Sequence, residues 1–442
     1  MKLENSFIYI KKSEGLGGIA FVEGAKNSML PIAPAAFLSN EESVLKNIPN
    51  SDDLKAMINL MEYFGAKCEY SKEKKTLKIN CEKLENKIAP LELFKEYRAS
   101  TLFAGALLGK FKEFWIGYPG GDKIGKRPLD IHLNSFKALG AEYEYKEDYI
   151  HVYAKKLTGG EIFLDYASVG ATQNILLLAS SIPEKITIHN AAQEPEVLDL
   201  IDALRNMGVQ INLKFQSIIE VCGSKNLKGY NHEIIPDRLE TATLILAAAI
   251  TGGSIKIPNA PAYLLKNFIQ KLKFMNHEII IGQNDIGITF ISTEKPRSTS
   301  IKTMPYPGFS TDLQPQMMSL FAVTPGESII HETVFESRMQ HAIEMNKMGA
   351  NISIEYDYAK IKGVDKLYGT TVNANDIRAF ASLLLAGLIA EGETKIYGVK
   401  HLLRGYVGLD EKIRNLGGNI ELINENKFKA SNLNEEKIIL LN

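Results

Sequence analysis

The sequence predicts an α/β protein with two domains, each made of three similar units. Its 442 residues exceed what one ordinary hydrophobic core organises, since domains typically contain about 100–200 residues. An amphipathic helix that ends at Gly or Asn, followed by a β-hairpin pattern, recurs at intervals of roughly 70 residues. Six such mixed α/β units predict two pseudo-threefold domains. The alternative is a single irregular α/β chain in which the recurrence of this pattern is a coincidence.

Each amphipathic helix is expected to end at a residue in the left-handed conformation. Glycine adopts this conformation without steric cost, and asparagine is the usual substitute. The alternating apolar pattern after each of these positions indicates a strand. The six expected helix ends are Gly65, Gly140, Gly208, Asn276, Gly349 and Gly417.

A second, nearly all-apolar helix precedes each amphipathic helix. A helix that is apolar on every side is buried, so each unit should have one core helix and one surface helix. The expected core helices cover residues 29–38, 101–108, 175–182, 241–250, 316–323 and 380–389.

The residues that open the six core helices are polar in every copy. They are residues 24–28, 98–100, 168–172, 236–238, 310–312 and 376–378. Ser, Asn and Asp at these places are ordinary helix caps. Capping does not explain Lys26, Arg98, Arg238 and Arg378, because a cation at a helix N-terminus opposes the helix dipole. Two domains that point these ends at one cleft would bind phosphates or carboxylates there.

Residues 117–128 form the strongest candidate for a functional loop. The segment holds four glycines and two prolines, and Lys123, Lys126 and Arg127 surround the carboxylate of Asp122. It lacks the GxxxxGK[ST] pattern of a P-loop. We expect a lid that carries positive charge to an anionic substrate.

The charge balance excludes several classes of partner. The chain has 51 basic and 52 acidic residues, so it has no net positive charge that would attract nucleic acid or anionic lipid. No segment shows the long apolar run of a membrane span, and the N-terminus lacks a signal-peptide pattern, so a cytoplasmic protein is expected. Neither His132 nor His341 has a partner at metal-ligand spacing, and no metal or cofactor is expected.

Nine short motifs occur in order along the chain, and through them it resembles the enolpyruvyl transferase family. The resemblance is to the members that act on UDP-N-acetylglucosamine. The motifs are GAKNS at Gly24, PGGDKIGKRPLDIH at Pro119, SVGAT at Ser168, AAQEPEVLDL at Ala191, PDRLE at Pro236, PGFSTD at Pro307, ETVFESR at Glu332, DIRA at Asp376 and HLLRGY at His401.

The resemblance implies a fold of two inside-out α/β barrels, each of three βαβαββ repeats, with the substrate cleft between them. The first domain is expected at residues 24–231 and carries the 117–128 lid. The second is expected at residues 1–21 together with 236–442.

The resemblance also implies a reaction. The 3-hydroxyl of UDP-N-acetylglucosamine attacks C2 of phosphoenolpyruvate while C3 takes a proton, and the tetrahedral ketal then expels phosphate. This is the first committed step of peptidoglycan synthesis. Two proton transfers need two acid–base groups. Asp312 is the implied base, and Asp122 on the lid is the implied proton donor or the group that assists product release.

Fixed cations suit the charge that phosphoenolpyruvate brings to the site. By resemblance, Lys26, Arg127 and Arg404 contact the phosphate, and Lys26 and Arg404 also count as catalytic. Arg338 and Arg378 hold the carboxylate, because a planar guanidinium binds a carboxylate bidentately. Asn27 adjoins both substrates.

The UDP-sugar is expected along residues that share the same motifs. Asp376 is expected to orient the neighbouring arginines, and Arg98 to face the phosphate side or the nucleotide. The remaining UDP-sugar contacts are Asn27, Arg127, Pro128, Leu129, Asp130, Ser168, Val169, Gly170, Asp312, Val334 and Phe335.

Two positions depart from the family pattern. Asp122 stands where many members have cysteine, and an aspartate can donate a proton if its pKa rises but is a poor soft nucleophile. We therefore expect normal turnover with insensitivity to fosfomycin, whose epoxide alkylates that cysteine. Leu403 replaces an aspartate, which is expected to loosen the placement of Arg404.

Three other functions stay open at this point. The sister activity on shikimate 3-phosphate shares the fold, although the lid motif and the Val334–Phe335 segment favour the UDP-sugar. An inactive paralogue that only binds UDP-sugars is the second, because Asp122 and Leu403 lie near the site. A nucleic-acid-handling repeat protein is the third, and it lacks a basic or aromatic stripe. The sequence does not indicate a protein partner.

Overall fold

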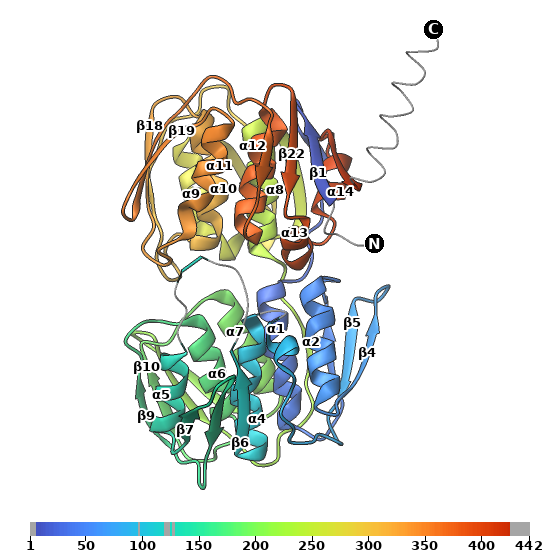
Figure 1. The fold of residues 1–442 in the computed structure, drawn as a ribbon, viewed down its shortest axis with the longest axis vertical. Coiled ribbons are helices and arrows are strands. Elements are labelled where there is room, and N and C mark those ends of the chain that lie inside the picture. The colour runs from blue at the N-terminus through green and yellow to red at the C-terminus, as the bar shows by residue number, and fades with distance from the viewer. Residues whose placement is uncertain (1–5, 96–97, 119–123, 126–128, 425–442) are drawn as a thin grey trace.

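The computed structural model describes residues 6–95, 98–118, 124–125 and 129–424. Within them, two hydrophobic cores form. One is built from residues 25–234, and the other from residues 8–22 and 239–420. The two cores correspond closely to the two domains expected from the sequence. The exact domain boundaries stay a prediction. Figure 1 shows the first part of the chain below, in blue to green, and the second above, in yellow to red with the blue strand β1.

Three apolar helices occupy the centre of each part, as expected from the six core-helix patterns. The helices are α1 (Lys26–Ala35), α4 (Phe103–Phe111), α6 (Val169–Ala179), α8 (Arg238–Thr251), α10 (Gln314–Val323) and α12 (Ile377–Ile389). Every residue from Arg238 to Ile250 in α8 and from Ile377 to Leu388 in α12 is buried.

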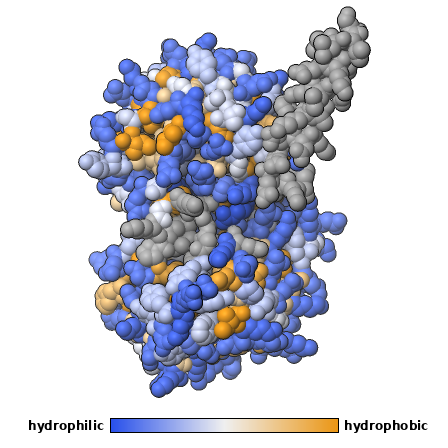
Figure 2. Space-filling model, in the orientation of Figure 1, coloured by the Kyte–Doolittle hydropathy of each residue, from blue (hydrophilic) through white to orange (hydrophobic). Residues whose placement is uncertain are grey.

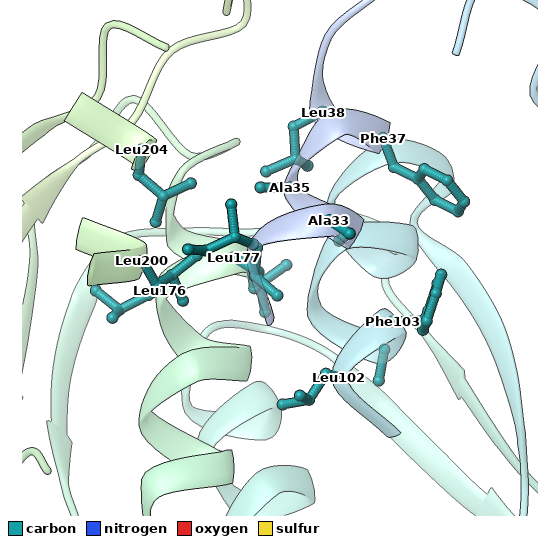
Figure 3. Close-up of a cluster of buried hydrophobic side chains, with 14 of the residues drawn as sticks. Ala33, Ala35, Phe37, Leu38, Leu102, Phe103, Leu176, Leu177, Leu200 and Leu204 are labelled. Carbon is teal, nitrogen blue, oxygen red and sulfur yellow. The ribbon is translucent and has the colours of Figure 1, made fainter. Parts of the chain in front are cut away.

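Helix α6 begins six residues before the expected start because its polar first turns are buried with partners. The amide of Asn174 donates to the Thr101 carbonyl at 2.9 Å, and its side-chain oxygen accepts from Gly105 N at 2.8 Å. These bonds tie α6 to α4. Figure 3 shows the apolar contacts beneath them, where Phe37 meets Phe103 edge to face at 5.6 Å.

Amphipathic helices lie around the central ones and end where the sequence predicted. All six end residues have positive φ, from 73° at Asn276 to 99° at Gly208. The helices are α2 (Asp52–Tyr63), α5 (Asp130–Ala138), α7 (Pro195–Asn206), α9 (Lys266–Phe274), α11 (His341–Lys347) and α14 (Leu409–Asn415). Two further helices in the described part of the chain are α3 (Leu91–Lys95) and α13 (Val399–Gly405).

Among the described residues, six small sheets enclose the helices, one for each repeat, so both barrels are inside-out. In the first part the orders are β13-β3-β5-β4, β6-β8-β7 and β11-β12-β10-β9. The strands are β3 (Ser43–Lys46), β4 (Lys67–Ser71), β5 (Thr76–Asn80), β6 (Glu113–Gly117), β7 (Glu142–Tyr145), β8 (Tyr149–Tyr153), β9 (Gly160–Phe163), β10 (Ile186–His189), β11 (Gln210–Lys214), β12 (Ile218–Cys222) and β13 (Asn231–Glu233).

The second part repeats this plan and includes the N-terminal strands. The orders are β15-β16-β14-β2, β17-β18-β20-β19 and β21-β22-β1-β23. The strands are β1 (Ser6–Lys11), β2 (Gly17–Ile19), β14 (Ser254–Pro261), β15 (Glu278–Ile281), β16 (Ile286–Ile291), β17 (Ile301–Lys302), β18 (Glu327–His331), β19 (Asn351–Glu355), β20 (Tyr358–Lys362), β21 (Thr371–Asn373), β22 (Glu393–Tyr397) and β23 (Ile420–Asn424).

The two connections between the parts run side by side. Gly24 and Pro236 form an isolated antiparallel bridge, and Ala25 N donates to the Ile235 carbonyl at 2.8 Å. A Cβ at position 24 would collide with the Asn47 carbonyl, so this crossing requires glycine. The paired crossings place the start of α1 opposite the start of α8.

One face of the molecule is largely hydrophilic. Figure 2 shows hydrophilic side chains over most of one face, with apolar residues in small groups. Among the described residues, no helix has the length and apolar character needed to cross a bilayer.

Candidate active site

A cavity of about 640 Å³ opens between the two parts of the molecule and is lined by both. Most of the expected UDP-sugar residues with described side chains lie on its wall. They are Asn27, Ser168, Val169 and Gly170 from the first part, and Asp312, Val334 and Phe335 from the second. A cavity of this size between domains suits a small-molecule ligand.

The start of α6 forms one wall of the cavity. Ser168 caps the helix, its hydroxyl accepting from Ala171 N at 3.4 Å. A Cβ added to Gly170 would lie 3.4 Å from the His132 ring, at van der Waals contact distance. The cavity wall is therefore closely packed at this position. Because backbone N–H groups at a helix start favour an anion, this wall suits a phosphate-bearing ligand.

The opposite wall holds Asp312 between two arginines. Asp312 lies in a 3₁₀ turn, Thr311–Leu313, that leads into α10. Arg338 donates to its Oδ1 at 2.6 Å, and Arg378 donates to its Oδ2 at 3.0 Å and 3.2 Å. The Asp312 side chain is 26% exposed, whereas those of Arg338 and Arg378 are 2% and 7% exposed.

This arrangement controls the charge of Asp312. Burial alone would raise the pKa of its carboxyl group, but the guanidinium groups of Arg378 and Arg338 outweigh burial and hold that pKa far below its usual range. Asp312 is therefore ionised, and it is a weak base while both arginines contact it.

Arg378 is fixed from two further directions. Its Nη1 donates to the Tyr406 hydroxyl at 2.9 Å, and Asp376 Oδ1 accepts from the backbone N of Arg378 at 2.8 Å. Asp376 thus orients Arg378 by capping α12. The Nε of Arg338 is buried and has no hydrogen-bond partner among the described residues, so this guanidinium retains a donor.

A second carboxylate joins two of the expected phosphate ligands. Asp53, in the first turn of α2, accepts from Lys26 Nζ at 3.0 Å and from Arg404 Nε at 3.0 Å. Lys26 begins α1, while Arg404 comes from α13 on the other side of the cleft. Leu403, which was expected to loosen the placement of Arg404, is partly buried against the second core. Arg404 nevertheless contacts Asp53. Sequence reasoning missed Asp53, because Asp52 and Asp53 both look like ordinary first-turn acids.

The glutamates of the AAQEPEVLDL motif also contact the second part. Arg238 makes a two-bond pair with Glu196, at 2.9 Å and 3.2 Å. Tyr306 N donates to Glu194 Oε1 at 3.2 Å, and burial raises the pKa of Glu194. Each helix-opening cation whose side chain is described, namely Lys26, Arg238 and Arg378, therefore has an internal carboxylate partner.

Glu332 fixes the segment that carries Val334 and Phe335. Its Oε1 accepts from Val334 N at 2.9 Å and from Phe335 N at 3.2 Å, and its carboxylate also accepts from the hydroxyl of Thr311. One buried side chain thereby ties this cavity wall to the turn that holds Asp312.

Only a small part of the expected lid is described. Ser337 N donates to the Ile124 carbonyl at 3.1 Å, and a Cβ on Gly125 would collide with the Glu336 carboxylate. Ile124 and Gly125 therefore contact the second part of the chain. The expected site residues Asp122, Arg127 and Pro128, and the side chain of Arg98, lie outside the described residues.

Leu129 and Asp130 lie at the start of α5, where Asp130 Oδ1 accepts from Ile131 N at 2.8 Å. Neither lines the cavity, although Ile131 and His132 do. Within the described ranges, no group of three or more His, Cys, Asp or Glu side chains is placed to hold a metal ion.

Comparison with known proteins finds relatives that match along most of the chain. Residues 10–413 match the EPSP synthase (3-phosphoshikimate 1-carboxyvinyltransferase) family. A UDP-N-acetylglucosamine 1-carboxyvinyltransferase 1 of Caldanaerobacter subterraneus is 44% identical over 93% of this chain and 98% of its own. Proteins with the corresponding name from Finegoldia magna and Staphylococcus epidermidis are each 42% identical over 94% of this chain, and over 98% and 99% of their own.

Solved structures show the same fold. The enolpyruvyl transferase NikO from Streptomyces tendae superposes with a TM-score of 0.87 at 23% identity, over 95% of this chain and 99% of its own. EPSP synthase from Acinetobacter baumannii gives 0.73 at 18% identity, over 95% and 100%. With six repeats in two inside-out barrels and a sequence match along most of its length, the chain belongs to the EPSP synthase family of enolpyruvyl transferases.

Proposed function

We propose that the protein transfers the enolpyruvyl group of phosphoenolpyruvate to the 3-hydroxyl of UDP-N-acetylglucosamine, with release of phosphate, in the cytoplasm. This reaction begins peptidoglycan synthesis. The observation that carries the proposal is the cavity wall where Asp312 lies between Arg338 and Arg378, facing the α6 helix start across the cavity. The names of relatives at 42–44% identity support the UDP-sugar as acceptor.

The first half of the reaction is an addition. Asp312 takes the proton of the sugar hydroxyl as the oxygen bonds to C2 of phosphoenolpyruvate, and C3 receives a proton. The product is a tetrahedral ketal that carries both the sugar and the phosphate. Asp122, outside the described residues, is the proposed proton donor to C3.

The second half is an elimination. The ketal loses a proton from C3 as the C2–O bond to phosphate breaks, which yields the enolpyruvyl ether and inorganic phosphate. Lys26 and Arg404 stabilise the leaving phosphate with positive charge in a cleft shielded from water. Arg127 is a further proposed phosphate ligand.

The geometry of Asp312 adds a condition to this mechanism. While both arginines bind it, its pKa is too low for efficient removal of a hydroxyl proton. The carboxylate of phosphoenolpyruvate binds the same guanidinium groups and takes over part of their charge. The pKa of Asp312 then rises toward its ordinary range, so the second substrate activates the base only when it is in place.

The test is release of inorganic phosphate from phosphoenolpyruvate with UDP-N-acetylglucosamine, with shikimate 3-phosphate, and with neither acceptor. Release with the UDP-sugar alone is expected. Release with shikimate 3-phosphate would transfer the proposal to the sister activity. Binding of the UDP-sugar without release would indicate an inactive binding protein.

Fosfomycin gives a separate test of Asp122. Because a carboxylate is a poor soft nucleophile, turnover should continue at fosfomycin concentrations that inactivate an Asp122→Cys variant. Mass spectrometry after incubation should find an adduct on the cysteine variant and none on the wild type. An adduct at Asp122 would overturn this part of the proposal.

A further inference from the structure

The hydroxyl group of Tyr406 lies where the three central helices of the second part meet. It contacts one side chain from each helix, namely Thr243 of α8 at 3.0 Å, Gln316 of α10 at 3.2 Å and Arg378 of α12 at 2.9 Å. All four side chains are buried. Tyr406 itself follows α13, so a residue from outside the central helices ties the three together.

The donors available fix the direction of each of these hydrogen bonds. Thr243 donates its one hydroxyl hydrogen to the Leu239 carbonyl at 2.8 Å, so it accepts from Tyr406. The Tyr406 oxygen in turn accepts from Gln316 Nε2 and from Arg378 Nη1, which occupies both of its lone pairs. The hydroxyl therefore cannot turn away from Arg378 without breaking another buried hydrogen bond.

Arg378 uses three of the five N–H groups of its guanidinium in these contacts. Nε and one N–H of Nη2 donate to Asp312 Oδ2, and one N–H of Nη1 donates to the Tyr406 hydroxyl. Among the residues that the structure describes, none accepts from the second N–H of Nη1 or of Nη2. Two such groups on adjacent terminal nitrogens can bind a carboxylate with two hydrogen bonds.

Asp312 competes for these two donors. Its negative charge attracts the whole guanidinium of Arg378, and this attraction favours a turn that would bring Nη1 to Asp312 as well. The bond to Tyr406 opposes that turn, because it holds the one terminal nitrogen that does not contact Asp312.

We propose that Tyr406 is a positioning residue, which holds Arg378 so that one N–H of each terminal nitrogen stays available to the carboxylate of phosphoenolpyruvate. The inference rests on the proposed function and deepens it, because it assigns the geometry of the carboxylate site to a side chain that is itself only 2% exposed. Thr243 and Gln316 contribute by fixing the direction of the hydroxyl.

The main experiment compares Tyr406→Phe with the matched control Ser382→Ala. Ser382 lies on α12 one turn after Arg378, and its buried hydroxyl contacts that of Ser319 on α10 at 2.7 Å. Both variants thus remove a buried hydroxyl between central helices, but only Tyr406→Phe removes a contact to Arg378. The KM for phosphoenolpyruvate should rise about 10-fold in Tyr406→Phe and the KM for UDP-N-acetylglucosamine by less than about twofold. Ser382→Ala should change both by less than about twofold.

Calorimetry separates the carboxylate from the phosphate without catalysis. Phosphoenolpyruvate carries both groups, whereas inorganic phosphate carries no carboxylate. In Tyr406→Phe, the Kd of phosphoenolpyruvate should weaken about 10-fold, while the Kd of inorganic phosphate should stay within about twofold of wild type. A Kd of phosphoenolpyruvate that is unchanged, or that weakens no more than that of phosphate, overturns the inference, as does a wild type that binds no phosphoenolpyruvate.

This binding comparison also separates the inference from the proposed function. If the wild type binds phosphoenolpyruvate but releases no phosphate from it with UDP-N-acetylglucosamine, the proposed function fails. The two Kd values of Tyr406→Phe still decide the role of Tyr406 in that case.

A purely structural role of Tyr406 gives another pattern. Loss of folded enzyme would lower kcat and leave the KM for phosphoenolpyruvate unchanged, which would overturn the inference. If Tyr406→Phe does not fold, Thr243→Val serves instead, since it removes only the acceptor of the Tyr406 hydroxyl hydrogen. The KM for phosphoenolpyruvate should rise about threefold in Thr243→Val and stay at the wild-type value in Thr243→Ser, which keeps the hydroxyl. Equal KM values in these two variants would contradict the proposed role.

Discussion

The two carboxylates that hold cations at the cleft are built in different ways. Asp312, Arg338, Arg378 and Tyr406 all belong to the second core region, so this cluster can form within one part of the molecule. Asp53 and Lys26 belong to the first part and Arg404 to the second, so that cluster needs both. The difference implies that the proposed carboxylate site is preformed, whereas the proposed phosphate site depends on how the two parts meet.

The largest expected effect comes from Asp312→Asn. An amide cannot take a proton from a hydroxyl, so the rate of phosphate release should fall about 1,000-fold or more. Arg338 and Arg378 would also lose their shared counter-ion, which should lower the free energy of unfolding by about 3 kcal/mol. Steady-state kinetics and chemical denaturation measure the two effects. Activity within tenfold of wild type would exclude Asp312 as the base.

The next comparison sets Arg378→Met against Arg404→Met. Each removes one proposed phosphoenolpyruvate ligand, and each should reduce kcat/KM for that substrate about 100-fold. Only Arg404→Met removes a link between the two parts, so it alone should expand the molecule in small-angle X-ray scattering without ligand. Equal scattering profiles for the two variants would contradict the proposed difference between the sites.

The contributions of Glu240 and Asp312 to stability should change with pH in opposite directions. Burial, only partly offset by Lys412, raises the pKa of Glu240 from 4.5 to about 7. The folded chain therefore keeps a proton that the unfolded chain loses between these values. The stability from Glu240 is complete below pH 4.5 and is lost as pH rises through about 7. Asp312 has a lowered pKa, so its contribution is instead lost as pH falls below the range of an unfolded aspartate.

The variant Glu240→Gln tests the direction in which the contribution of Glu240 to stability changes with pH. Between about pH 5 and 8, the variant should gain on the order of 2 kcal/mol in unfolding free energy relative to wild type. Urea denaturation at several pH values measures the difference, and Glu278→Gln on the exposed part of β15 is the control. A difference that does not change with pH would show that Glu240 stays ionised throughout.

The smallest expected effects come from two helix-cap variants. Ser51→Ala removes the cap beside Asp53, and Ser310→Ala removes the hydroxyl that accepts from Asp312 N at 3.3 Å. Each should cost about 1 kcal/mol of unfolding free energy. Ser51→Ala should raise the KM for phosphoenolpyruvate about twofold, while Ser310→Ala should lower kcat. The opposite assignment of the two kinetic effects would contradict the roles given to Asp53 and Asp312.

Much of the fold could be predicted from sequence because its signals are local. The six left-handed helix ends were confirmed, since a glycine or asparagine after an apolar helix has a strong conformational preference. The core helices were also correct, although α6 starts earlier. Buried polar residues such as Asn174 look like surface residues until their partners on α4 are known.

The candidate site was only partly visible in the sequence. Lys26, Arg238 and Arg378 could be singled out because a cation at a helix start opposes the helix dipole. Their carboxylate partners could not, because Asp53, Glu196 and Asp312 are distant in the chain from at least one cation that they bind. The expectation that an anion offsets these cations is met inside the molecule, by its own carboxylates.

The sequence by itself determined the repeats, the buried helices and the helix-opening cations, because periodicity, glycine conformations and helix dipoles act over a few residues. Only the tertiary structure decided which carboxylate faces which cation. That choice depends on how two separately built cores meet, and on whether a buried charge finds a partner across the cleft. Asp52 and Asp53 are neighbours with the same chemistry, and one helical position separates an exposed surface pair from a link between the two parts of the molecule.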